Sequence, residues 1–343
     1  MTEVSLRDPE LLLARLRAIH EAIRAAVIDA CERTATDKLA AVVGQDAGDT
    51  VFAIDRVSEE VLLAHFAALA ETWPCLLIAE GLGQDGRRVL PEGTPLGDVE
   101  IAVIVDPIDG TRGLMYQKRP AWILTGVARY RGRPPTLADI ELALQTEIPL
   151  VKQNLSDTLW AVAGRGASGE RWNRVDGARA PLALTPSLSR SILQGFGGVA
   201  RFFPGGRPEL AAIDDEVVEQ LLGPPRAGVA LSFEDQYICT GGQLYELIVG
   251  HDRWIADLRP LIEPLLAARG QALGLCCHPY DLCTELIARE VGVIVTDAIG
   301  RPVSAPLDVF TPVTWVGYAN AWIRDLVAPA LGAALSRRNL LSP

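Results

Sequence analysis

One short segment constrains this chain more than any other: a β-branched run that stops at two acids and a glycine. Residues 101–105 read Ile-Ala-Val-Ile-Val, and residues 106–111 read Asp-Pro-Ile-Asp-Gly-Thr. The run predicts a buried strand, and Pro107 predicts its end because proline cannot continue a central strand. Gly110 permits a sharp change of direction. We therefore expect two carboxylates in one tight turn beside free backbone N–H groups, an arrangement that suits a hard dication holding a phosphate.

The hexapeptide at 106–111 resembles the signature of the inositol monophosphatase superfamily, a group of metal-dependent, lithium-sensitive phosphomonoesterases. Three individually weaker motifs accompany it in the family's order. They are Asp-Thr-Val-Phe-Ala-Ile-Asp at 49–55, Leu-Ile-Ala-Glu-Gly at 77–81, and His-Pro-Tyr-Asp-Leu-Cys at 278–283, which Glu-Val-Gly-Val-Ile-Val-Thr-Asp follows at 290–297. Because the motifs span residues 49 to 297, the resemblance covers most of the chain.

The chain departs from the family pattern at several positions near these motifs. Gly81 stands where the family has the second acid of a Glu-Glu pair, and Tyr280 stands where it has a tryptophan. Cys283 and Thr284 replace the small residues after the last aspartate. The run Arg-Gly-Leu-Met at 112–115 resembles the bisphosphate nucleotidase branch more closely than the inositol monophosphatase branch. These departures concern the substrate-facing wall more than the metal site.

The resemblance implies a site for two or three magnesium ions. Glu80, Asp106 and the carbonyl group of Ile108 would hold the first ion. Asp106 would also bridge to a second ion, whose ligands Asp109 and Asp281 would complete. Clusters of carboxylate and carbonyl oxygens are the ligands that hard dications prefer.

The resemblance also assigns catalytic and substrate-binding roles. Asp55 and Thr111 would orient or deprotonate the attacking water, and Glu80 would help to hold that water. The backbone N–H groups of Gly110 and Thr111 would bind the phosphate. Water would attack phosphorus in line, so no phospho-enzyme is expected.

Most of these residues also have a plain structural interpretation when each is taken alone. Asp55 and Asp281 each precede an expected helix and would serve as N-caps. Glu80 fits a solvated loop acid, and Arg112 fits a surface arginine as well as a contact to a second phosphate. His278 fits a structural histidine as well as a residue that lines the substrate pocket.

Apolar periodicity predicts mixed helices and strands, which favours a layered fold. Helices are expected at 9–31, 56–70, 236–250 and 281–291, and strands at 76–79, 101–105, 122–129, 158–163 and 293–296. The resemblance makes this an α+β fold, the α-β-α-β-α sandwich of the inositol monophosphatase and fructose-1,6-bisphosphatase type. Residues 180–187 predict a boundary between two sub-domains. The N-terminal α+β sub-domain, at 1–185, would carry most of the metal ligands. The C-terminal α/β sub-domain, at 186–343, would carry Asp281 and the substrate-selecting wall.

Composition excludes several classes of function. The 343 residues are 49% hydrophobic and carry a net charge of −11, which indicates a globular protein that binds neither nucleic-acid polymers nor anionic membranes. No apolar run reaches about 18 residues, and the N-terminus has no basic-then-apolar pattern, so we expect a cytoplasmic protein. The spacing of the six cysteines does not indicate a set of disulfide pairs, and the cysteines at 276–283 do not have the spacing of a zinc site. Reduced thiols are therefore expected. A homodimer is common in the family, although nothing in this sequence shows an interface.

The expected function is a magnesium-dependent phosphomonoesterase that acts on inositol monophosphate or a similar polyol or sugar phosphate. The alternatives are a 3′(2′),5′-bisphosphate nucleotidase, a fructose-1,6-bisphosphatase, and a non-catalytic member of the fold that binds or regulates. The chain is longer than the compact members that it resembles, and the extra length is expected in 84–99, 131–157 and 251–277. The last segment precedes Asp281, so we expect a distinct substrate preference.

Overall fold

The structure is a computed structural model that describes residues 6–34, 42–46, 49–82 and 85–341. Its α-helices are α1 (Pro9–Arg33), α3 (Ala53–Ala70), α4 (Thr111–Met115), α5 (Arg207–Leu222), α6 (Thr240–Ile248), α7 (Glu263–Ala267), α8 (Pro279–Leu282), α9 (Glu285–Glu290) and α10 (Ala321–Arg337). The first strands are β1 (Val42–Asp46), β2 (Asp49–Phe52), β3 (Cys75–Ile78), β4 (Arg87–Leu90), β5 (Ile101–Asp109), β6 (Ala121–Arg129) and β7 (Ile140–Ile148). The later strands are β8 (Leu155–Val162), β9 (Ala167–Asn173), β10 (Arg179–Leu182), β11 (Phe196–Val199), β12 (Asp252–Asp257), β13 (Ile294–Thr296) and β14 (Trp315–Tyr318).

Two sheets organise the described part of the chain. The larger sheet has the order β10-β9-β8-β7-β6-β5-β3-β4, with β3 and β5 parallel and the other neighbours antiparallel. The smaller sheet has the order β11-β12-β14-β13, with only β11 and β12 parallel. Strands β1 and β2 form a separate antiparallel pair.

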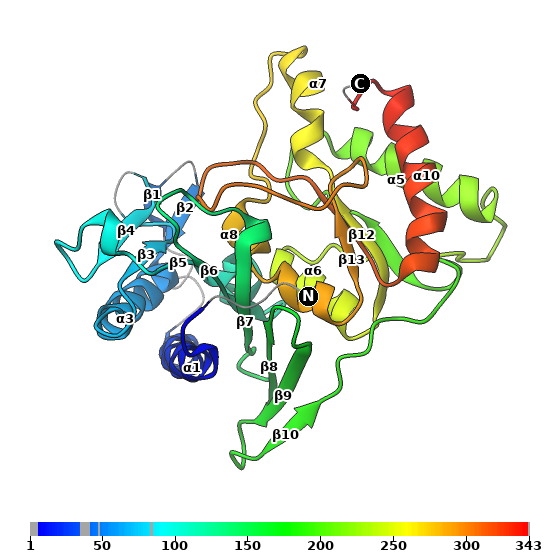
Figure 1. The fold of residues 1–343 in the computed structure, drawn as a ribbon. Coiled ribbons are helices and arrows are strands. Elements are labelled where there is room, and N and C mark those ends of the chain that lie inside the picture. The colour runs from blue at the N-terminus through cyan, green and yellow to red at the C-terminus, as the bar shows by residue number, and fades with distance from the viewer. Residues whose placement is uncertain (1–5, 35–41, 47–48, 83–84, 342–343) are drawn as a thin grey trace.

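Helices fill three layers around these two sheets (Figure 1). Helices α1 and α3 cover one face of the large sheet. Helices α6, α8 and α9 lie between the two sheets, and α5 and α10 cover the far face of the small sheet. One buried apolar cluster lies at each of these three levels. The predicted α-β-α-β-α sandwich is therefore confirmed.

The amphipathic N-terminal helix forms as its apolar spacing predicts. In α1, Leu12, Leu16, Ile23 and Val27 recur on one face and are fully buried. That face packs against α3 and β7, because an apolar stripe of this width is stable only when another layer covers it. The packing fixes α3, and with it Asp55, against the large sheet.

Strand β5 differs from its predicted end. It runs on through Pro107 to Asp109, and its pairing with β6 slips between Asp106 and Asp109. The slip is a bulge, a place where a strand accommodates proline without losing a ladder hydrogen bond. The two acids therefore come from the bulged end of a strand and not from a turn after it.

One other prediction needs correction, and one stays untested. The single helix expected at 281–291 is two short helices, α8 and α9, so Asp281 is the third residue of α8 and does not precede the helix. The segments expected to hold extra length contain sheet strands: β4 lies in 84–99, β7 in 131–157 and β12 in 251–277. These segments therefore contribute to the two sheets, and the expectation that they hold the extra length stays a prediction.

The sub-domain boundary stays a prediction. The chain leaves the large sheet at Leu182 and enters the small sheet at Phe196, while the apolar cluster between the sheets takes residues from both halves. Within the described residues, none of the helices has both the length and the apolar character that a membrane span requires.

Candidate functional site

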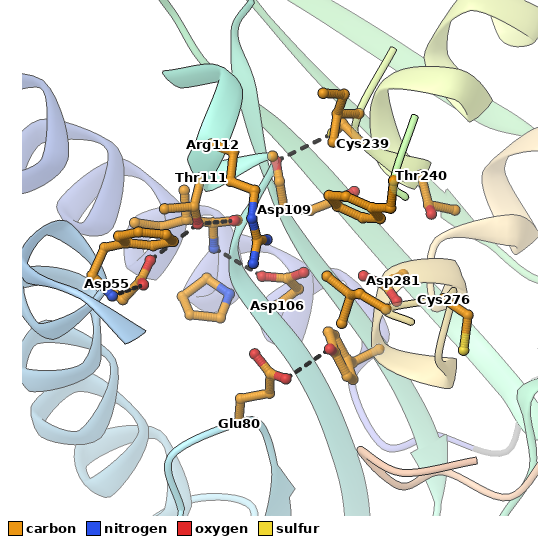
Figure 2. Close-up of a pocket in the computed structure, with 18 of the residues that line it drawn as sticks. Asp55, Glu80, Asp106, Asp109, Thr111, Arg112, Cys239, Thr240, Cys276 and Asp281 are labelled. Carbon is orange, nitrogen blue, oxygen red and sulfur yellow. Dashed lines mark hydrogen bonds between the residues drawn. The ribbon is translucent and has the colours of Figure 1, made fainter. Parts of the chain in front are cut away.

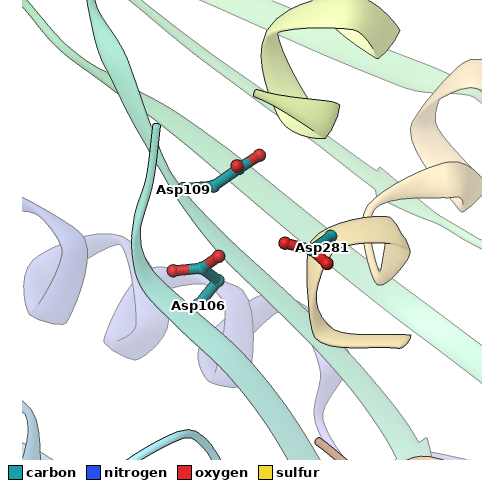
Figure 3. Close-up of side chains that lie close together, drawn as sticks. All are labelled: Asp106, Asp109 and Asp281. Carbon is teal, nitrogen blue, oxygen red and sulfur yellow. The ribbon is translucent and has the colours of Figure 1, made fainter. Parts of the chain in front are cut away.

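Three aspartates from distant parts of the chain meet in one cavity between the large sheet and the middle helices. Asp106 and Asp109 come from the end of β5, and Asp281 comes from α8. One carboxylate oxygen of each lies within 4.8 Å of one from each of the others. Figure 3 shows the three side chains converging from opposite sides of the cavity.

The bulge in β5 and the turn after it fix the first two acids. The backbone N–H of Ile108 donates to Oδ1 of Asp106 at 2.9 Å, which holds that carboxylate against its own strand. Gly110 then reverses the chain at φ +97°, where a Cβ atom would also meet the Cβ and Sγ of Cys239 at 3.2 Å. Glycine is therefore the residue that fits here.

Asp109 is held by the start of α6. It is 6% exposed, and its Oδ2 accepts a hydrogen bond from the backbone N–H of Gly241 at 2.5 Å. The Cys239 thiol donates to the backbone carbonyl of Asp109 at 3.2 Å. Sequence reasoning missed Gly241 and Cys239, because only the packing of α6 against β6 brings them to β5.

Asp55 and Asp281 combine capping with a place in the site. Each is the third residue of its helix: Asp55 Oδ2 accepts from the Phe52 N–H at 2.8 Å, and Asp281 Oδ2 accepts from the His278 N–H at 2.6 Å. Both therefore satisfy a donor at the helix start, although neither is the N-cap residue itself. Asp55 Oδ1 still faces the cavity and lies 3.0 Å from Thr111 Oγ1.

The Thr111 hydroxyl links Asp55 to the bulge of β5. Its Oγ1 lies 3.0 Å from Asp55 Oδ1 and 2.9 Å from the carbonyl oxygen of Ile108, so its single proton is donated to one of the two acceptors. Figure 2 shows Asp55 and Thr111 on one side of the cavity, opposite Asp281. This side of the cavity therefore places a carboxylate and a hydroxyl within hydrogen-bonding distance of each other.

The three aspartates are difficult to ionise together when no cation is bound. Burial raises the pKa of Asp106 well above its ordinary value, and the charges of Asp109 and Asp281 raise it further. Burial and the charge of Asp109 likewise raise the pKa of Asp281. Burial raises the pKa of Asp109 to about 6, despite the opposing hydrogen bond from Gly241. A hard dication fits this donor set, because it would neutralise converging carboxylates that repel one another.

Glu80 lies beside the three aspartates but outside their cluster. It follows β3 at the next strand end and lines the same cavity. Its Oε1 accepts a hydrogen bond from the Tyr280 hydroxyl at 2.7 Å. Figure 2 shows Glu80 below Asp106, with the dashed contact to that hydroxyl.

Gly81 has a local explanation. Its φ is +78°, and a Cβ atom there would lie 2.9 Å from Oε1 of Glu59. The carboxylate of Glu59, from α3, thus occupies the space beside residue 81 and lines the cavity with Glu80. The departure from the Glu-Glu pair therefore leaves two acids at this edge, one of which comes from a helix that the motif does not include.

Two arginines and two phenylalanines form the wall above the acids. The guanidinium groups of Arg112 and Arg259 both lie over the ring of Phe203, at 5.3 and 5.4 Å from its centroid, and Arg259 also lies 4.4 Å from that of Phe202. Arg259 is 6% exposed and donates to both carboxylate oxygens of Asp257, at 2.8 and 2.5 Å. Arg112 points into the cavity in Figure 2. Sequence reasoning missed Arg259, since its only signal was an arginine two residues after a strand-terminal acid.

His278 is not part of this wall. It is not among the described residues that line the cavity. Its ring stacks on that of Tyr280, with centroids 5.5 Å apart and planes 8° from parallel. This position supports the structural interpretation of His278 more than contact with a substrate.

The cysteines near the site behave as buried thiols. Cys239, Cys276, Cys277 and Cys283 are each less than 9% exposed, and all are free. Burial raises the pKa of every one of these thiols. Among the described residues, the one group of acids, histidines and cysteines placed to share a metal ion is the three aspartates.

A buried glutamine on β7 joins the two middle helices behind the site. Gln145 is fully buried; its Nε2 donates to the Gly241 carbonyl at 2.8 Å, and its Oε1 accepts from the Thr284 hydroxyl at 2.9 Å. One side chain thus contacts two segments of the site. The first is the start of α6, which binds Asp109, and the second directly follows α8, the helix that carries Asp281.

Replacing Gln145 with leucine is expected to lower the free energy of unfolding by about 2–4 kcal/mol, because a buried carbonyl and a buried hydroxyl would each lose a partner. Urea unfolding followed by circular dichroism measures this. Gln271→Leu, at an exposed turn, is the control and should change stability little. Equal stability of the two variants would show that water replaces the lost contacts.

Comparisons with known proteins support the fold described above. No protein-family model matches the chain, and no curated protein matches it in sequence. Similar solved structures include fructose-1,6-bisphosphatase from Leishmania major in holo form, with 13% identity over 93% of each chain and a TM-score of 0.67. They also include the extragenic suppressor protein SuhB from Bartonella henselae, with 14% identity over 94% of this chain and 98% of that one and a TM-score of 0.63. A third example is inositol monophosphatase from Anabaena, with 14% identity over 96% of this chain and 100% of that one and a TM-score of 0.60. The resemblance inferred from the four motifs is therefore confirmed at the level of the fold.

Proposed function

We propose that this chain, whose fold is that of the inositol monophosphatase superfamily, is a magnesium-dependent phosphomonoesterase. The observation that carries the proposal is the convergence of Asp106, Asp109 and Asp281 on one point of the cavity, although Asp281 lies more than 170 residues after Asp106. Such a cluster is unfavourable unless a cation binds it, so its presence argues for a working site. It also argues against a non-catalytic member of the fold, which would have no need of these acids.

The residues that would hold the ions are those predicted from the motifs. Asp106, Asp109 and Asp281 would bind them directly, with Glu80 and the carbonyl of Ile108 at the edge of the cluster. When bound, magnesium ions lower the pKa of water and stabilise charge on the phosphoryl oxygens. Phosphate-monoester hydrolysis has a very high intrinsic barrier, which is why a site of this charge density is needed.

The side chains opposite Asp281 would handle the proton. When the Thr111 hydroxyl donates to Asp55, its oxygen presents a lone pair to a water in the cavity. That water would give a proton toward Thr111 as Asp55 takes up the threonine proton, and its oxygen would form a bond to phosphorus. The bond between phosphorus and the ester oxygen breaks on the opposite side. The departing alkoxide takes up a proton from water and Asp55 returns its proton to the solvent, so the products are inorganic phosphate and the free alcohol.

Backbone groups at the β5–α4 junction would orient the phosphate. Gly110 and Thr111 line the cavity, and the first N–H groups of a helix have no partner within it. These N–H groups would donate to the non-reacting phosphate oxygens. His278 is not needed for this step, because it lies outside the cavity lining.

Inositol monophosphate or a similar polyol or sugar phosphate is the leading substrate class. Proteins of similar structure include an inositol monophosphatase and a fructose-1,6-bisphosphatase, which supports a small phosphorylated substrate. A second candidate is a substrate with a second anionic group, such as a 3′(2′),5′-bisphosphate nucleotide or fructose 1,6-bisphosphate. The observation that favours it is the pair of arginines, Arg112 and Arg259, on the wall above the acids.

A panel of phosphomonoesters tests the proposal. Phosphate release would be measured with magnesium and with a chelator, from inositol 1-phosphate, 3′-phosphoadenosine 5′-phosphate, fructose 1,6-bisphosphate and several sugar phosphates. Magnesium-dependent release supports the proposal, and the best substrate decides between one and two anionic groups. A folded protein that binds magnesium but releases no phosphate from any of them would argue for the non-catalytic alternative.

Lithium is expected to inhibit the reaction. A small monovalent cation would compete for the position between Asp109 and Asp281, where it cannot supply the charge of a dication. The measurement is phosphate release at fixed magnesium with rising lithium chloride, and sodium chloride at the same ionic strength is the control. Equal rates in the two salts up to high concentration would count against this position as a magnesium site.

A further inference from the structure

One hydrogen bond joins the end of β3 to α8 across the cavity. The Tyr280 hydroxyl, from α8, donates to Oε1 of Glu80, which follows β3, at 2.7 Å. The two residues are 200 positions apart in the chain. The contact therefore exists only because α8 packs against the end of the large sheet.

Tyr280 is itself held rigidly. It is 6% exposed, and its ring stacks on that of His278. It belongs to the same four-residue helix as Asp281, whose carboxylate accepts from the His278 N–H at 2.6 Å. One helical turn thus carries one acid of the cluster and the hydroxyl group that contacts Glu80.

Glu80 gains an orientation from this contact. A glutamate side chain that is free to rotate loses conformational entropy when it is fixed at a site. The hydroxyl binds one carboxylate oxygen of Glu80, and both residues line the cavity that contains the three aspartates. Groups that hydrogen-bond to a metal-binding side chain orient it and strengthen binding, often by 10–100-fold.

We propose that Tyr280 is a positioning residue, which holds Glu80 beside the three aspartates and thereby raises the affinity of the cluster for a divalent cation. The inference rests on the proposed function only in requiring that the cluster binds such an ion. This inference assigns a specific role to Tyr280, which is one of the departures from the family pattern.

Manganese binding to the metal-free, full-length protein tests the inference without substrate. Free Mn²⁺ is followed by electron paramagnetic resonance during a titration. Tyr280→Phe keeps the ring that stacks on His278 and removes only the hydroxyl, and we expect it to weaken binding by about tenfold or more. Tyr245→Phe is the matched control, because Tyr245 also donates to a carboxylate, Asp157, at 2.7 Å, but outside the cavity lining. It should bind Mn²⁺ as the wild type does.

A double-mutant cycle separates positioning from a general structural role. In a Glu80→Ala background, Tyr280→Phe should have no further effect on Mn²⁺ affinity, since the residue that it orients is gone. Wild-type or tighter binding by Tyr280→Phe, or an equal loss in both backgrounds, overturns the inference, as does a wild-type protein that binds no Mn²⁺. A protein that shows the expected differences in binding but hydrolyses no phosphomonoester would instead reject the proposed function alone.

Discussion

Asp106→Asn is expected to abolish phosphate release, by at least about a thousandfold, while the protein stays folded. Asp106 lies at the centre of the acid cluster, so its loss removes charge from the whole site, and the hydrolysis of phosphate monoesters depends on such stabilisation. Asparagine is isosteric and keeps an oxygen that can accept the Ile108 N–H. The rate is measured with the best substrate of the panel, at saturating magnesium.

The fold of this variant is checked by its urea midpoint and circular dichroism spectrum. Asp325→Asn, at an exposed position on α10, is the control and should retain full activity. If Asp106→Asn kept more than about a tenth of the wild-type rate, the aspartate cluster would not be the catalytic centre, and the proposed mechanism would be wrong.

The metal-free protein is expected to lose stability through Asp109 as the pH rises from about 4 to above 6. The pKa of Asp109 is about 6 in the folded protein, against an ordinary value of 3.8. A carboxyl group whose pKa is raised by folding favours the folded state while it is protonated, and this contribution disappears as the group ionises. A difference of this size corresponds to about 3 kcal/mol. Saturating magnesium should restore the loss, because it binds only the folded, ionised cluster.

Asp109→Asn removes this contribution together with the repulsion that Asp109 exerts on Asp106 and Asp281, which acts in the same direction. Urea unfolding of the chelator-treated protein is compared between pH 5 and pH 8 for wild type and variant, because other buried groups also titrate. The pKa values of Glu147, Asp214 and Asp252 are raised to about 7 and act in the same direction, while that of His20 is lowered to about 3 and acts in the opposite one. The wild type should lose more stability than the variant over this range. Identical changes in the free energy of unfolding of the two proteins would show that ionisation of Asp109 does not destabilise the folded state.

Local patterns were enough to predict several elements and the main acids. The apolar spacing of 9–31 predicted α1 because one face of a helix must be buried, and the β-branched run predicted the core of β5. The hexapeptide and the order of the other motifs indicated Asp106, Asp109 and Asp281, which the fold brings together. The elements depend on residues a few positions apart in the chain. The acids were found from the order of the motifs, which can be recognised although the sequence identity to similar proteins is low.

Features made by contacts across the fold were not predictable in the same way. The continuation of β5 past Pro107 depends on a bulge opposite β6, and Gln145 on β7 acquires its role only from Gly241 and Thr284. Arg259 reaches the cavity because β12 ends beside it. No local pattern indicates which of several similar side chains will meet across two sheets.

The sequence by itself therefore determined the kind of fold and the acids of the site: a layered α+β sandwich in which three predicted aspartates converge. Only the tertiary structure decided how those acids are held. It placed Asp109 on the start of α6, Glu80 on the hydroxyl of Tyr280, and two arginines on the facing wall. The physical reason is that a motif specifies which groups a short segment presents, whereas hydrogen bonds and electrostatic repulsion act between groups that only packing makes neighbours.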